Sequence, residues 1–513
     1  MRKLLVCMTA GAAVLTAAVA TQLPATAADE SVVRTTYGTV RGTLNPDSRV
    51  FLGVPFAAPP TGDFRWRAPR PPASWSGVRD ATQVSEQCLQ VGWPGEPPPG
   101  SEDCLYLNVW TPRQTTSPKP VMVFLHGGGF ITGSGRFYDP TRLLAQDDVL
   151  FVSVNYRLGA LGYLKHPSLK DPYAGNFGLA DQQAALRWVR ANIASFGGDP
   201  HNVTLWGESA GAFSTCAQLA APGARGLFDK AIVQSGPCAN NLVTKSVAEQ
   251  RALKAATTVG CPDARTAVAC LRAKPAAAFA ALDEERVGLV RRSDQLPWMP
   301  VTGTPALPLQ PLAAMRHGLA ADVPIILGGT KDEMRGFVSN LLPITPEEYP
   351  GEIRRLFGDD APAVLKAYPA SRYDSPAVAL ATAMTDEGKM LGACAQLPVA
   401  KAARGPVYLY EFAEDSGRMI GDYPLGAYHG SDVPYFFGSS YRPGPGSPPP
   451  LTERQKVLAD KLSGYWTTFA RTGVPGSEWS AVRDGTALSV TVDKVAQISL
   501  AAEHNCRFWK AVG

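Results

Sequence analysis

The sequence predicts an α/β protein with a large, mostly parallel, twisted central sheet flanked by helices and carrying helical and loop insertions. Short apolar runs rich in β-branched and aromatic residues alternate with longer segments of helical periodicity. Such alternation is typical of parallel sheets covered on both faces. Of the 513 residues, 45% are hydrophobic and 18% are charged, which provides a large core and excludes a disordered chain.

Six segments are expected to be buried strands of this sheet. Each is bounded by glycine, proline or a polar turn. In chain order they are residues 121–125, 152–155, 203–206, 231–234, 323–327 and 407–412. Between the second and third segments, Leu186, Val189, Ile193 and Phe196 recur at spacings of three and four, which predicts a helix.

The N-terminal residues are expected to direct export. Arg2 and Lys3 precede the uncharged apolar run 4–20, and residues 25–27 form an Ala-Thr-Ala cleavage site. Residues 1–27 are therefore predicted to be a signal peptide that is removed from a secreted protein. The apolar run is too short for a stable membrane anchor.

The rest of the chain is predicted to be one domain, residues 28–513. The Pro/Gly-rich segments 93–100 and 441–450 are interpreted as surface loops, because strand and helix patterns resume on both sides of each. The formal net charge of +4 is too small for a nucleic-acid-binding surface, so no such partner is expected. The oligomeric state stays open.

The cysteine content agrees with export. Of nine cysteines, Cys7 falls within the signal peptide, and the remaining eight predict disulfides whose pairing the count leaves open. The sequence has no CxxC pair and no Cys/His cluster with zinc spacing. No metal site is therefore expected.

Ser209 is the candidate nucleophile. The predicted strand 203–206 runs into Gly207-Glu208-Ser209-Ala210-Gly211 and then into a segment compatible with a helix. In a nucleophile elbow, a sharp strand-to-helix turn exposes the serine, and side chains in place of the glycines would collide with neighbouring elements. The pentad alone is a weak signal, so the prediction depends on its strand–turn–helix context.

A glycine run is the candidate oxyanion hole. The predicted strand 121–125 ends in His126-Gly127-Gly128-Gly129-Phe130. Glycines at the end of a strand let backbone N–H groups face a developing oxyanion. The expected donors are Gly128, Gly129 and Ala210. His126 is interpreted as a structural residue, because the base of such enzymes follows the serine in the chain.

Three histidines follow Ser209 and are candidates for the base. His429 is preferred over His317 and His504, because it lies in a Gly-bounded loop after the strand 407–412. His504 is the second choice.

The acid is expected just after a strand that lies between the serine and the base. The strand 323–327 leads into Gly328-Gly329-Thr330-Lys331-Asp332-Glu333. Asp332 and Glu333 are both candidates, and this pattern does not separate them.

Further blocks carry a resemblance to a known family, and the likeness runs over nearly the whole mature chain. They are Phe51-Leu52-Gly53-Val54-Pro55-Phe56-Ala57, Ser101-Glu102-Asp103-Cys104-Leu105-Tyr106-Leu107-Asn108, Asn155-Tyr156-Arg157, Gly175-Asn176-Phe177-Gly178-Leu179 and Phe196-Gly197-Gly198-Asp199-Pro200. With the serine pentad and the glycine run, they resemble the type-B carboxylesterase family, which includes carboxylesterases, cholinesterases and some lipases. The chain is similar to its secreted bacterial members. The resemblance implies an α/β-hydrolase fold and no cofactor.

The resemblance also implies roles for residues. Ser209 would be the nucleophile, His429 the base and Glu333, rather than Asp332, the acid; the oxyanion hole would be formed by Gly128, Gly129 and Ala210. The family usually has Glu three residues after the base, where this chain has Asp432. The implied disulfides are Cys88–Cys104, Cys261–Cys270 and Cys394–Cys506. Cys216 and Cys238 remain open between a disulfide and two thiols.

The expected function is hydrolysis of small carboxylic esters through an acyl-enzyme on Ser209. One alternative keeps the same triad but acts as a lipase or as an amide or carbamate hydrolase. Another is a non-catalytic binding scaffold of the same fold. The sequence does not define the acyl and alcohol pockets.

Overall fold

The structure is a computed structural model that describes residues 29–512, apart from 93–95, 114–116, 147–148, 284–288, 439–447 and 483. The predicted signal peptide, residues 1–27, lies outside the described residues, as do parts of the two predicted surface loops. Within the described ranges, no helix is long and apolar enough to cross a membrane.

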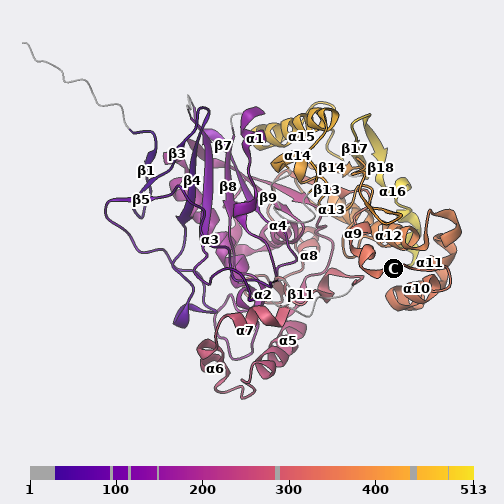
Figure 1. The fold of residues 1–513 in the computed structure, drawn as a ribbon, viewed down its shortest axis with the longest axis horizontal. Coiled ribbons are helices and arrows are strands. Elements are labelled where there is room, and N and C mark those ends of the chain that lie inside the picture. Colours follow the sequence, from indigo (N-terminus) through magenta and orange to yellow (C-terminus); the bar gives the residue numbers. More distant parts are fainter. Residues whose placement is uncertain are drawn as a thin grey trace, which may run out of the picture.

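A central sheet of eleven strands dominates the described part of the chain (Figure 1). From one edge to the other, its strands are β18 (Val495–Ser499), β17 (Thr486–Val490), β14 (Val407–Phe412), β13 (Ile325–Thr330), β10 (Lys230–Gln234), β9 (Gly198–Glu208), β7 (Lys119–Leu125), β8 (Leu150–Val154), β6 (Tyr106–Pro112), β4 (Ser48–Pro55) and β3 (Thr43–Leu44). All pairs from β17 to β8 are parallel. The pairs at the two edges are antiparallel. The prediction of a mostly parallel sheet is confirmed.

The six predicted strands correspond to β7, β8, β9, β10, β13 and β14. The largest difference is in β9, which runs from Gly198 to Glu208, whereas the prediction was 203–206. β13 is shifted: it begins at Ile325 and extends to Thr330, whereas the prediction was 323–327. Pro324 has no N–H to donate to a neighbouring strand, so it is disfavoured inside the ladder. At the other end, pairing with β14 continues through Thr330. Glycine is needed at position 328 because a Cβ there would lie 2.1 Å from the ring of Tyr410 on β14.

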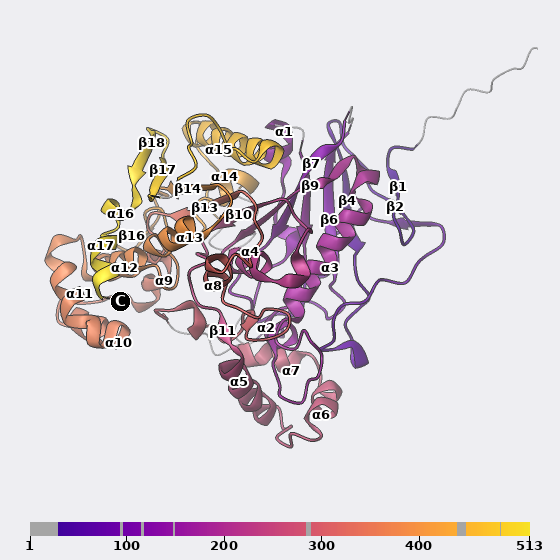
Figure 2. The same cartoon turned by 180° about the vertical axis from the view of Figure 1, so that it is seen from behind.

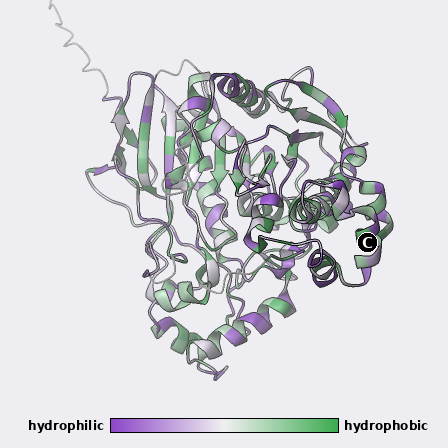
Figure 3. Ribbon diagram, turned by 45° about the vertical axis from the view of Figure 1, so that its right-hand side comes forward, coloured by the Kyte–Doolittle hydropathy of each residue, from purple (hydrophilic) through white to green (hydrophobic). Residues whose placement is uncertain are grey.

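Helices cover both faces of the sheet, and β7 shows how. Val121, Val123 and Leu125 pack with α3 (Phe177–Asn192) and α4 (Ala210–Ala220). Met122 and Phe124 pack on the opposite face with α1 (Thr141–Gln146), α14 (Pro434–Phe437) and α15 (Glu453–Thr472). Because successive side chains of a strand point to opposite faces, a strand buried on both sides is apolar throughout. Figure 3 shows hydrophobic residues along these central strands and mixed surfaces on the helices around them.

The predicted helix between the second and third strands is present as α3, followed by a 3₁₀ turn over Ile193–Phe196. Its four periodic apolar residues are fully buried.

The remaining helices form the insertions and the C-terminal end. They are α2 (Gly159–Tyr163), α5 (Lys245–Thr258), α6 (Ala267–Ala273), α7 (Ala277–Ala280), α8 (Pro311–Arg316), α9 (Arg335–Val338), α10 (Tyr349–Phe357), α11 (Ala361–Ala367), α12 (Pro376–Glu387), α13 (Leu397–Ala402), α16 (Leu500–Glu503) and α17 (Cys506–Val512). In Figures 1 and 2, α5, α6 and α7 group at one end of the molecule, and α10 and α11 lie at its edge. Small sheets pair β1 (Val32–Arg34), β2 (Thr39–Arg41) and β5 (Val78–Asp80), β11 (Val243–Thr244) with β12 (Val301–Thr302), and β15 (Met419–Ile420) with β16 (Tyr423–Pro424).

Four disulfides link the eight cysteines of the described chain. Cys88–Cys104, Cys261–Cys270 and Cys394–Cys506 are paired as the resemblance implies. Cys216 on α4 also pairs with Cys238, which follows β10, and this answers the question that the sequence left open. This disulfide links α4, the helix that follows Ser209, to the loop after β10.

Candidate active site

Ser209 lies in the sharp turn between β9 and α4. Its backbone has φ 56° and ψ −120°, a conformation that non-glycine residues rarely adopt. The turn is held by hydrogen bonds: the N–H of Ser209 donates to the carbonyl of Gln234 on β10 at 2.9 Å, and its carbonyl accepts from Ala212 at 2.9 Å. The local structure is the strand–turn–helix that the pentad predicts.

The two glycines of the pentad are required by close approach. A Cβ on Gly207 would lie 2.1 Å from the carbonyl oxygen of Gly211, and a Cβ on Gly211 would lie 2.0 Å from the carbonyl oxygen of Leu125 at the end of β7. Both distances are far shorter than a van der Waals contact. The prediction that side chains here would collide with neighbouring elements is confirmed.

Ser209, His429 and Glu333 form one chain of hydrogen bonds. His429 Nε2 lies 2.9 Å from Ser209 Oγ, and His429 Nδ1 lies 2.6 Å from Glu333 Oε2. Glu333 is fully buried, and its other oxygen, Oε1, accepts the N–H of Thr330 at 2.9 Å. The carboxylate therefore fixes the ring so that Nε2 faces the serine.

Asp332 joins the loops that carry Glu333 and His429. Its Oδ2 accepts the N–H of Ala427 at 3.0 Å, and its own N–H donates to the carbonyl of Ala427 at 3.0 Å. Arg335 pairs with its other oxygen at 2.9 Å. Asp332 thus binds the backbone two residues before His429, whereas Glu333 contacts the ring.

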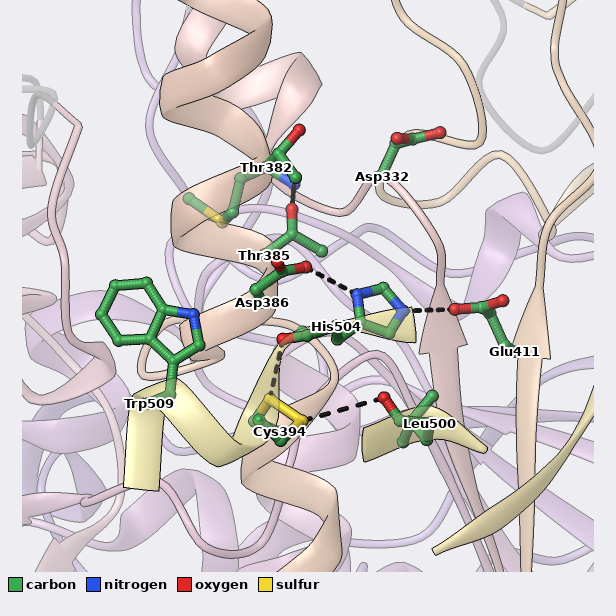
Figure 4. A network of polar contacts seen from close by, with 12 residues as sticks. Asp332, Thr382, Thr385, Asp386, Cys394, Glu411, Leu500, His504 and Trp509 are labelled. Atoms are coloured by element: carbon green, nitrogen blue, oxygen red, sulfur yellow. Dashed lines mark hydrogen bonds and ion pairs between the residues drawn. A yellow bond between two sulfur atoms is a disulfide. The ribbon is translucent and has the colours of Figure 1, made fainter. Parts of the chain in front are cut away.

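His504 and His317 lie away from Ser209. His504 is buried between Asp386 on α12, at 2.8 Å, and Glu411 on β14 (Figure 4). Burial disfavours the charged imidazole, but the two carboxylates outweigh burial and raise the pKa of His504 to about 9. His317 is exposed and caps the end of α8.

Two more carboxylates surround the imidazole of His429. Glu208 Oε1 lies 3.4 Å from Nε2. Asp432 is buried, and its Oδ2 accepts the amide N–H of Gln234 at 2.8 Å. Burial opposes the charge on His429, but Glu333, followed by Glu208 and Asp432, outweighs burial and raises its pKa above the ordinary value. Burial, with the charges of Glu208 and Glu333, raises the pKa of Asp432 to about 7.

The glycine run after β7 forms a tight turn beside Ser209. Gly128, Gly129 and Phe130 all have positive φ, at 112°, 63° and 65°. The carbonyl of Gly128 points back into the turn and accepts the N–H groups of Ile131 and Thr132 at 3.1 and 3.0 Å. Gly128 and Gly129 line the same cavity as Ser209 and the first residue of α4, Ala210, whose N–H belongs to the unpaired first turn of a helix.

His126 lies behind this turn. It is 1% exposed, stacks on Tyr156 with ring centroids 4.4 Å apart, and its Nδ1 contacts the carbonyl of Gly127 at 2.8 Å. Burial lowers its pKa to about 4, so the ring is neutral at ordinary pH. These contacts agree with a structural role.

A cavity of about 410 Å³ opens over Ser209 and His429. Its other walls are mostly apolar, with few polar groups. They include Tyr138, Phe213, Leu296, Phe337, Asn340, Met390, Leu391, Tyr428 and Val433. These residues come from segments far apart in the chain, and the sequence motifs identified none of them.

The fold and the cavity together define a hydrolase of the α/β-hydrolase fold. The model of the Carboxylesterase family matches residues 29–509. The chain therefore belongs to this family and is a carboxylic ester hydrolase, as the sequence resemblance implies.

Similar proteins support this assignment. The para-nitrobenzyl esterase of Bacillus subtilis (strain 168) is 35% identical over 487 residues, which cover 90% of this chain and 94% of that protein. The fumonisin B1 esterase of Sphingopyxis macrogoltabida is 34% identical over 94% of this chain and 93% of that protein. A solved structure of PNB esterase has a TM-score of 0.79 at 33% identity, and the match covers 94% of this chain and all of the other.

Proposed function

We propose that the protein is a secreted serine carboxylesterase in which Ser209 is the nucleophile, His429 the base and Glu333 the acid. The observation that carries the proposal is the chain of hydrogen bonds from Ser209 through His429 to Glu333 at the floor of a cavity. Residues 28–513 would be the catalytic domain that remains after residues 1–27 are removed. The four disulfides support export to an oxidising compartment.

Acylation follows from this geometry. Neutral His429 accepts the hydroxyl proton at Nε2 while Ser209 Oγ attacks the ester carbonyl carbon. The resulting oxyanion is stabilised by the N–H groups of Gly128, Gly129 and Ala210. The imidazolium then gives its proton to the departing alkoxide, which leaves as the alcohol. The acyl group stays on Ser209 as an acyl-enzyme.

Deacylation repeats these steps with water. His429 takes a proton from a water molecule that attacks the acyl carbon, and Ser209 leaves with that proton as the acid is released. Glu333 stabilises the imidazolium in both halves. Glu208 and Asp432 add negative potential at the same ring, which favours its charged form in the transition state.

The cavity favours uncharged esters of modest size. Its walls are apolar except for a few groups such as Glu208, Asn340 and Tyr428, and no Lys or Arg lies among the described residues that line it. Two relatives are named for para-nitrobenzyl and fumonisin B1 esters, which agrees with ester substrates. A lipase or an amide or carbamate hydrolase would use the same three residues. The intact hydrogen-bond chain argues against a non-catalytic scaffold.

The test is hydrolysis of p-nitrophenyl acetate and butyrate by the purified mature protein and by Ser209→Ala. We expect turnover by the native protein and a loss of about 10³-fold or more in the variant. Equal turnover by a folded variant would contradict the assignment of Ser209. Rates on dissolved tributyrin and on its emulsion separate an esterase from a lipase, because only a lipase gains from the interface.

A further inference from the structure

A second cavity lies beside the C-terminal helix α17. Its volume is about 700 Å³, and its walls come from the end of α8, the segment after α12, α13 and α17. Among the described residues, none that lines this second cavity also lines the cavity over Ser209. The proposed ester hydrolysis makes no use of it.

Positive charge dominates the rim of the second cavity. Arg316, Lys401 and Lys510 come from three different helices, are exposed, and form no ion pair with any described residue. The acidic residue of the lining, Glu387, pairs with Arg291, which also bonds Asp360, and with Lys389 of the same lining at 3.0 Å. Unpaired cations around one cavity favour the binding of an anion there.

The inner wall is apolar and fixed in place. Trp509, which is 6% exposed, and Leu397 lie in it next to the Cys394–Cys506 disulfide. The indole N–H of Trp509 donates to the hydroxyl of Tyr368 at 2.7 Å. Figure 4 shows His504 with Asp386 and Glu411 beside the disulfide, and Cys394 Sγ lies 3.3 Å from the carbonyl oxygen of His504. A wall held this firmly loses little freedom when it binds a ligand.

One segment forms a wall of both cavities. Met390 and Leu391 line the cavity over the serine, whereas Lys389 lines the second cavity. Asn240, which also lines the second cavity, donates from its amide to the carbonyls of Gly388 at 2.8 Å and Met390 at 2.9 Å. A ligand that contacts Asn240 or Lys389 therefore acts on the wall of the ester cavity.

We propose that the second cavity binds an amphipathic carboxylate, with its anionic group among Arg316, Lys401 and Lys510 and its apolar chain against Trp509. Its occupancy changes the kinetics of the ester cavity through residues 388–391. The binding claim stands on the second cavity alone. The kinetic claim rests on the proposed esterase function.

Calorimetric titration with sodium decanoate tests the binding. The native protein is compared with the triple variant Arg316→Glu, Lys401→Glu and Lys510→Glu, whose changes are all at exposed positions. Lys366→Glu, a single charge reversal at an exposed and unpaired residue on α11, is the control outside the cavity. We expect decanoate to bind the native protein and the control alike, about tenfold or more weakly to the triple variant, and more weakly as salt is added. Equal affinity in all three proteins, or no binding to the native protein, overturns the proposal.

A second arm excludes binding at the ester cavity. Diethyl p-nitrophenyl phosphate forms an adduct with an activated serine, which fills the cavity over Ser209. Decanoate binding that persists in the adduct supports the second cavity, and binding lost in the adduct but kept in the triple variant overturns it. If no adduct forms, the proposed function fails, and the triple variant still decides the question of binding.

The kinetic claim has its own readout. With p-nitrophenyl acetate, decanoate should change kcat in the native protein and not in the triple variant. Inhibition that is purely competitive and unchanged in the triple variant overturns the coupling.

Discussion

Glu333→Gln is the substitution whose effect the geometry defines most closely. It keeps the size of the side chain and removes the charge that lies 2.6 Å from His429 Nδ1. Two charges with centres about 4 Å apart interact by about 4 kcal/mol at an effective dielectric constant of about 20. Glu333 is fully buried and the His429 side chain is 14% exposed, which limits screening. If the transition state loses most of this attraction between Glu333 and the imidazolium, kcat/KM falls by about 10²- to 10⁴-fold.

The pH dependence of the same variant tests the role of Glu333 independently, through the direction in which the acid limb of kcat/KM shifts. The negative charge of Glu333 favours the imidazolium, so it raises the pKa of His429. Activity requires the neutral ring and falls as pH drops through that pKa. Removal of the charge lowers the pKa, so the acid limb of kcat/KM moves to lower pH in Glu333→Gln.

The assay is kcat/KM for p-nitrophenyl butyrate from pH 5 to 10, with Asp332→Asn as the matched control. That variant also converts a carboxylate of the same loop, 17% exposed, to an amide, but its carbonyl oxygen still accepts the N–H of Ala427. We expect the control to lose less than about tenfold. Equal losses in both variants, or an acid limb that stays in place in Glu333→Gln, would refute the reasoning.

Three further predictions concern stability. Gly211→Ala places a methyl group against the Leu125 carbonyl and should lower the unfolding free energy by about 2 kcal/mol or more, measured by urea denaturation. The raised pKa of His504, about 9 against 6.5 when unfolded, stabilises the fold below pH 6.5 by about 3 kcal/mol and is lost as pH rises through 9. His504→Gln should therefore be least stable relative to the native protein near pH 6, and a constant difference up to pH 10 argues against this. Replacement of Cys394 and Cys506 by Ala should cost about 3–5 kcal/mol, because their bond closes the longest loop; an unchanged melting temperature contradicts that estimate.

The strands and the turn that carries Ser209 could be predicted because their signals are local. Strands buried on both faces are continuous apolar runs, and the serine turn needs glycines that approach Leu125. The local pattern could not separate Glu333, the proposed acid, from Asp332. Asp332 and Glu333 both follow β13, and the choice depends on which side chain the turn directs toward His429. That direction depends on contacts with a loop about 95 residues away, which no local pattern contains.

The environment of the base and the cavity walls were not predicted. Glu208 occupies the variable position of the pentad, directly before Ser209. Its place in the sequence was the one signal that a second carboxylate could lie near His429. Phe213, Leu296 and Phe337 come together only through packing of separate insertions. The Cys216–Cys238 bond likewise depends on α4 lying against the loop after β10.

The central claim is that Ser209 carries the acyl group, and one measurement tests it most directly. The native protein is mixed rapidly with p-nitrophenyl acetate, the release of p-nitrophenol is followed, and the quenched protein is digested and analysed by mass spectrometry. We predict a burst of one p-nitrophenol per protein and an acetyl group on the peptide that contains Ser209. Turnover without acetylation of that serine, or acetylation of a different residue, would contradict the account.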